Sequence, residues 1–91
     1  MDSPVMLADC SAIQMCIRPS KLTTLNVDRL VELIREIDYV TDTCYDMGAI
    51  WFNINLFKFG AAYGKPDMIR AIVFTQNRLR AISQKCLGVE E

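Results

Sequence analysis

The fold of this chain depends on the segment GAIWFNINLFKFG, residues 48–60, because its pattern is compatible with both a helix and a strand. As a strand, it alternates Ile50, Phe52 and Ile54 with other residues, and strands favour such aromatic and β-branched side chains. As a helix, it places Asn55 within the apolar face. A strand needs a pairing partner, and we find no second strand signal in the chain. We therefore expect a helix buried on all sides, with a strand paired to its own copy in a symmetric dimer as the alternative.

The residues before this segment show the clearest helical pattern in the chain. Asn26 is a favourable N-cap, and Asp28 lies in the first turn, where the helix dipole favours an acid. Apolar residues then recur every three or four positions, which predicts a long helix over 26–60, with a break near residue 48 as an alternative. The heptad-like apolar seam of this helix is the expected oligomer interface. It consists of Leu33, Ile37, Val40, Cys44, Met47, Trp51 and Ile54.

A short helix is predicted at the N-terminal end. Ser3 is a favourable N-cap, and Pro4 takes the first helical position. The apolar residues that follow are spaced by four, three and four positions, and Pro19 ends the pattern. Residues 1–19 are therefore expected to form a helical arm that docks on the rest of the protein.

The last predicted helix extends over 66–87. Pro66 takes its first position, Asp67 favours the first turn, and Gly88 closes it. Its apolar stripe consists of Met68, Ile72, Thr75, Leu79, Ile82 and Cys86. A tight turn over 60–65 connects it to the long helix, which makes the two helices a hairpin.

These elements predict an all-α fold: a single domain, residues 1–91, built as a helical hairpin with a short N-terminal helix. Such a hairpin is one layer thick and has little interior of its own. Because hydrophobic residues make up 52% of the chain, it would leave apolar surface exposed. A second copy is the simplest cover for that surface. We therefore expect a homodimer of four-helix-bundle type.

The composition excludes several kinds of chemistry. The chain has no histidine, which excludes a Ser-His-Asp triad and a mixed Cys/His zinc site. Its four cysteines lie on predicted apolar stripes without a C-x-x-C pair, and the chain start lacks the positive region of a signal peptide. We expect reduced core cysteines, a cytoplasmic protein, and no metal or cofactor. No apolar run reaches the roughly 18 residues of a membrane helix, so no membrane partner is expected.

Charge is distributed unevenly along the chain. The net charge of −1 conceals a net of −4 over residues 1–57, +5 over residues 58–88 and −2 over residues 89–91. Opposite the apolar stripe of the last helix, cations alternate with neutral amides, a mixture that suits phosphate contacts. The candidate polyanion-binding residues are Lys65, Arg70, Asn77, Arg78, Arg80, Gln84 and Lys85. The alternative is a solvated face, or one that pairs with the acidic face of the long helix.

Two other groups of residues are interpreted as structural. Asp42 and Asp46 lie one helical turn apart, but they have neither a Glu-x-x-His partner nor a calcium-loop pattern, which indicates a solvated face. The aromatic residues between Trp51 and Tyr63 indicate core or a dimer interface. Base stacking or a peptide groove is the alternative for these aromatics.

The expected function is that of a non-enzymatic, self-associating helical interaction module that binds another protein or structured RNA. The more specific alternative is a binder of structured or double-stranded RNA through the basic face of residues 66–87. No small-molecule substrate is expected. Short viral or mobile-element proteins often have this compact, self-associating design, although that is an association with the fold alone.

Overall fold

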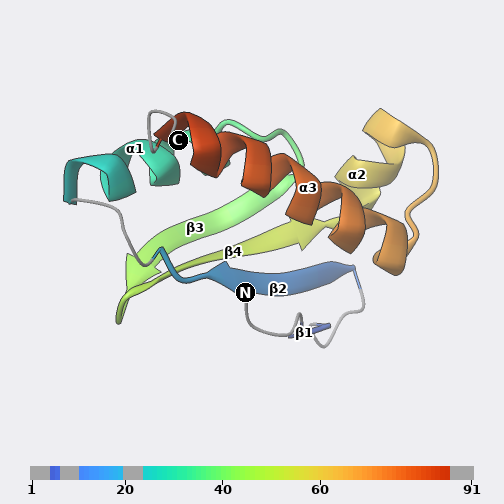
Figure 1. Cartoon of the computed structure of the whole chain (residues 1–91). Coiled ribbons are helices and arrows are strands. Elements are labelled where there is room, and N and C mark those ends of the chain that lie inside the picture. The colour runs from blue at the N-terminus through green and yellow to red at the C-terminus, as the bar shows by residue number, and fades with distance from the viewer. Residues whose placement is uncertain (1–4, 7–10, 20–23, 87–91) are drawn as a thin grey trace.

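The computed structural model describes residues 5–6, 11–19 and 24–86, and it shows a mixed α/β protein. The strands are β1 (Val5–Met6), β2 (Ala12–Ile17), β3 (Val40–Asp46) and β4 (Ala49–Asn55). The helices are α1 (Thr24–Arg35), α2 (Leu56–Tyr63) and α3 (Met68–Cys86). Figure 1 shows α1 and α3 lying along the same side of the sheet. The all-α prediction is therefore wrong.

The sheet has the order β1-β2-β4-β3, and every neighbouring pair is antiparallel. The strand β4 is central: Phe52 faces Met15 of β2, and Ile50 faces Tyr45 of β3. Because β2 and β3 are both antiparallel to β4, they run parallel to each other, and α1 makes the crossover between them. The ambiguous segment 48–60 therefore provides the middle of the sheet.

The long helix predicted over 26–60 is wrong, because it contains four separate elements in the structure. The first, α1, ends at Arg35, and β3 and β4 follow. The residue that disturbed the helical pattern, Asn55, is the N-cap of α2, where its side-chain oxygen accepts a hydrogen bond from the Lys58 backbone N–H at 3.0 Å. A strand of seven residues followed at once by a helix matches neither pure period.

The strand β3 was concealed by apolar spacing that also fits a helix. A two-residue loop, Met47 and Gly48, joins it to β4, and both residues have positive φ, 52° and 78°. A bulge between Thr41 and Cys44 interrupts the pairing of β3, and Asp42 within it has a φ of 56°. Bulges and charged residues are common on edge strands, where they discourage pairing with other chains.

The predicted oligomer seam does not exist as one surface. Ile37, Val40 and Ile54 are buried in the protein's own core. Cys44 and Met47 are exposed, and Met47 has 88% of its surface open to solvent. The two remaining seam residues, Leu33 and Trp51, are partly buried on different elements. The seven residues follow one helical face only if residues 40–54 are helical, which they are not.

The predicted helical arm over 1–19 is also wrong for the residues that the structure describes. Residues 12–17 form β2, in which Ile13 and Met15 are buried beneath the helices and Gln14 between them is only partly buried. Ser3 and Pro4, the predicted helix start, lie outside the described residues. The alternation over 12–17 spans six residues, too few to outweigh a helical spacing that matched at four positions.

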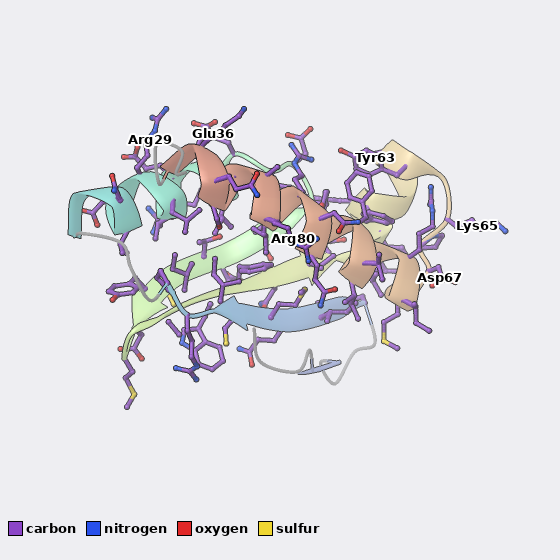
Figure 2. All side chains as sticks on the ribbon, viewed as in Figure 1. Arg29, Glu36, Tyr63, Lys65, Asp67 and Arg80 are labelled. Atoms are coloured by element: carbon purple, nitrogen blue, oxygen red, sulfur yellow. The ribbon has the colours of Figure 1, made fainter. Side chains whose placement is uncertain are left out.

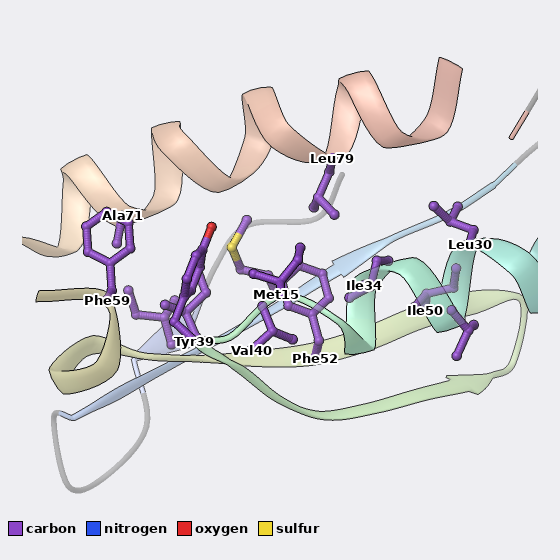
Figure 3. Close-up of a cluster of buried hydrophobic side chains, with 14 of the residues drawn as sticks. Met15, Leu30, Ile34, Tyr39, Val40, Ile50, Phe52, Phe59, Ala71 and Leu79 are labelled. Atoms are coloured by element: carbon purple, nitrogen blue, oxygen red, sulfur yellow. The ribbon is translucent and has the colours of Figure 1, made fainter. Parts of the chain in front are cut away.

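The core lies between the sheet and the helices (Figure 3). Ile13, Met15, Ile50, Phe52 and Ile54 contribute from the sheet, and Leu30, Ile34, Ala71 and Leu79 contribute from α1 and α3. The apolar faces of both helices are therefore covered by the protein's own strands. A helical hairpin completed as a four-helix bundle is wrong, because the surface that required a second copy is already buried.

Candidate functional site

The helix α3 corresponds to the predicted basic helix, and it carries positive charge without any carboxylate. Its 19 residues include Arg70, Arg78, Arg80 and Lys85 and no Asp or Glu. All of the predicted polyanion-binding residues except Arg78 are exposed. In Figure 2, Lys65 points away from the molecule in the loop before α3. The solvent-facing side of α3 thus carries cations and amides beside the exposed apolar residues Ile69 and Val73. We call its polar part the α3 face and define it as Arg70, Asn77, Arg80, Gln84 and Lys85.

The arginines of α3 are held by neutral groups. Arg80 Nη1 donates a hydrogen bond to Asn77 Oδ1 at 3.4 Å, and Arg70 Nη1 donates to the backbone carbonyl of Lys65 at 3.5 Å. Arg78 Nη1 donates to the Tyr63 hydroxyl at 3.1 Å. None of these contacts neutralises a guanidinium charge. They do not support the alternative in which the basic helix pairs with acidic residues of its neighbour.

A cluster of four aromatic rings joins α2 to α3 and to the loop before β3. The ring centroids of Tyr39 and Phe59 lie 5.2 Å apart with the planes at 85°, and those of Tyr63 and Phe74 lie 4.6 Å apart. The guanidinium of Arg70 lies 5.7 Å from the centre of the Phe59 ring, within the range of a cation–π contact. This aromatic cluster fixes the position of α3, and therefore of the α3 face.

The aromatic prediction was only partly correct. Phe59 and Tyr63 join the cluster, but Tyr39 and Phe74 belong to it as well, and their spacing in the sequence gave no sign of this. Phe57 has 72% of its surface exposed, so it does not belong to the core. Trp51 lies on β4 next to Phe52 in sequence, so its side chain points to the other face of the sheet.

Tyr39 is buried, and its hydroxyl group points toward α3 (Figure 3). The hydroxyl oxygen lies 3.0 Å from Thr75 Oγ1, which is also buried. Burial raises the pKa of Tyr39 above its ordinary value, while the Thr75 hydrogen bond and the charge of Arg78 oppose the shift. The phenol of an ordinary tyrosine is already protonated at neutral pH, and the raised pKa extends that state to higher pH. Tyr39 therefore acts as a hydrogen-bonding group that holds α3 on the sheet.

A groove of about 340 Å³ lies between α1 and the C-terminal half of α3. Leu33, Ile37, Ala81 and Ile82 supply apolar surface, and Glu36, Arg78 and Lys85 supply charge. The groove brings together two predicted sets, since Leu33 and Ile37 were assigned to an oligomer interface and Arg78 and Lys85 to a polyanion surface. Glu36, Ala81 and Ile82 belonged to neither set, because their place in the groove depends on how α1 and α3 meet.

Comparison of the chain with protein-family models, with curated proteins and with solved structures finds no match. These comparisons therefore indicate neither a family nor a function for the chain. The α3 face and the groove are therefore what supports a function.

The acidic residues that were interpreted as a solvated face lie apart from α3. Asp42 and Asp46 are both on β3, and Asp42 accepts a hydrogen bond from Asn53 Nδ2 at 3.1 Å. Within residues 5–6, 11–19 and 24–86, no three His, Cys, Asp or Glu side chains gather as a metal site requires.

The described cysteines differ in exposure. Cys16 is buried, whereas Cys44 is an exposed free thiol, so the expectation of a core position fails for Cys44. The side chains of the other two cysteines lie outside the described part of the chain. None of the described helices is long and apolar enough to cross a membrane.

Proposed function

We propose that the protein is a non-enzymatic binding module whose α3 face binds the phosphate backbone of structured or double-stranded RNA. The observation that carries this proposal is the set of arginines on a carboxylate-free helix, each of which donates a hydrogen bond to a neutral group within the described part of the chain. Guanidinium groups match the geometry of phosphate oxygens, and Asn77 and Gln84 add neutral donors to the same surface.

The dimensions of α3 are suitable for a duplex. Arg70 and Lys85 are fifteen positions apart in a continuous helix, which corresponds to roughly 22 Å along its axis. Arg70, Arg80 and Lys85 supply three exposed cations over that length. If these cations make three phosphate contacts, raising the salt concentration from 50 to 200 mM should lower the affinity roughly 40-fold, because binding releases counterions from the RNA.

Fluorescence anisotropy with a short, labelled, mixed-sequence RNA duplex tests this proposal. We expect binding at low salt with the salt dependence given above, and a loss of at least ten-fold in affinity for the double variant Arg80→Glu, Lys85→Glu. The control is the double variant Arg29→Glu, Lys58→Glu, which makes the same change in net charge at exposed positions outside α3. Arg78 is left intact because its bond to Tyr63 stabilises the aromatic cluster.

Absence of binding at low salt would overturn the proposal. So would equal losses for the two double variants, because they would show a response to net charge alone. A matched DNA duplex distinguishes recognition of the RNA shape from general binding of phosphates.

The location that we propose is cytoplasmic. The exposed free thiol of Cys44 supports a reducing compartment, where such a group persists without oxidation.

A further inference from the structure

We propose that the groove between α1 and α3 is a second binding site, which receives an amphipathic helix of a partner protein that carries carboxylates beside its apolar face. The site is distinct from the α3 face. It shares only Lys85 with that surface, and its floor is apolar.

The floor of the groove is formed by side chains from both helices. Leu33 of α1 and Ile82 of α3 are half-buried, so they complete the core and still present apolar surface to the groove. Ala81 is exposed, and its small side chain creates room between them. An amphipathic helix inserts its apolar side chains into a groove of this kind.

The charges along the groove indicate the sign of the partner. Arg78 and Lys85 line the α3 wall, and Glu36 is the one acidic residue among the lining residues. The Tyr63 hydroxyl holds Arg78 at 3.1 Å, so its guanidinium is oriented before a partner arrives, which lowers the entropic cost of binding. Two cations against one carboxylate favour an acidic partner.

The spacing of the two cations favours a helix as that partner. Arg78 and Lys85 are seven positions apart on α3, which is about two helical turns or 10 Å. A docked helix that runs alongside α3 has the same rise, so carboxylates at positions i and i+7 would face both cations at once. Its apolar residues, spaced three and four positions apart beside those carboxylates, would then lie over the groove floor.

Glu36 argues against a nucleic acid in the groove. Its carboxylate would repel a phosphate backbone, and the apolar floor offers phosphates no hydrogen-bond donors. The volume of about 340 Å³ is near the lower limit of small-molecule pockets, and it accommodates a few side chains of a longer ligand.

The test uses two synthetic helical peptides that share one leucine stripe. One peptide has glutamates at positions i and i+7 beside the stripe, and the other has lysines there. Calorimetry measures their affinities, and chemical-shift mapping on the ¹⁵N-labelled protein locates them. We expect the glutamate peptide to bind at least ten-fold more tightly and to shift the amides of Leu33, Ala81 and Ile82.

Two variants separate the groove from a non-specific apolar contact. Ala81→Gln fills the groove without changing its charge, and we expect it to lower the affinity for the glutamate peptide at least ten-fold. Ala62→Gln makes the same substitution at an exposed position of α2 and is expected to leave binding unchanged. Glu36→Gln removes the repelling carboxylate, so it is expected to strengthen binding of the glutamate peptide several-fold.

Equal affinity for the two peptides would overturn the proposal, as would shifted amides outside the groove. A dimer that dissociates in the Ala81→Gln variant would assign the groove to a second copy and would also overturn it. The RNA proposal is tested independently, because Ala81→Gln leaves Arg70, Arg80 and Lys85 in place. Thermal unfolding of each variant confirms that it is folded.

Discussion

Arg78 shows how a neighbouring side chain changes the role of a residue. A helical wheel places Arg78 on the polar side of α3, together with Arg80 and Lys85. In the structure Arg78 is half-buried, and its guanidinium bonds to Tyr63 on α2. The exposed cations could be predicted from the sequence because charge and helical period are local properties. The anchored one could not, because its partner is fifteen residues away on another element.

The buried pair of Tyr39 and Thr75 gives a prediction about stability. Tyr39→Phe or Thr75→Val leaves the other hydroxyl without this partner, and each change should lower the free energy of unfolding by about 1–3 kcal/mol. The double variant removes both polar groups and should cost clearly less than the sum of the two single variants. Urea denaturation measures all four proteins. Additive losses would show that the two hydroxyls do not depend on each other.

The element that most changed the expected fold is the β3–β4 hairpin. Apolar residues at Val40, Cys44, Met47, Trp51 and Ile54 fit a heptad, yet they lie on two strands and the loop between them. The same positions satisfy two periods, and sequence spacing does not choose between them. The loop chemistry was also inconspicuous, because Met47 occupies a position where Asn or Gly is usual.

The conformation of Met47 gives a prediction about this hairpin. Its φ of 52° is unfavourable for methionine, and its side chain is 88% exposed, so the residue gains little from packing. Met47→Asn should raise the free energy of unfolding by about 0.5–1 kcal/mol, because asparagine tolerates the left-handed region. Thermal or urea denaturation measures the change. Met47→Ala serves as the control, since alanine should give no such gain, and an equal gain would attribute the effect to the lost side chain.

The whole molecule buries the helix stripes that had suggested a homodimer. The residues that line the core on α1 and α3 pack against the sheet of the same chain. The exposed large apolar side chains are divided among the β3–β4 hairpin (Tyr45 and Met47), α2 (Phe57) and the N-terminal half of α3 (Met68, Ile69 and Val73). The packing argument for self-association therefore no longer applies.

The oligomeric state gives the corresponding prediction. We expect light scattering at micromolar concentration to return the mass of one chain, 10.4 kDa. The physical reason is that the core-facing residues of both helix stripes already pack against the sheet of the same chain, so the argument for a second copy as their cover no longer holds. A species of twice that mass would show that another surface, such as the edge of β3 or the groove, joins two copies.

The α3 helix and its charge pattern could be predicted from the sequence alone. A helix closes its backbone hydrogen bonds between residues four apart, so caps, apolar period and charge over residues 66–87 were enough to place it. The segment 48–60 was different. A strand satisfies its backbone groups on other strands, and the partners of β4 lie both before and after α1 in the chain. That pairing, and the groove that follows from packing α1 against α3, exist only once distant segments meet.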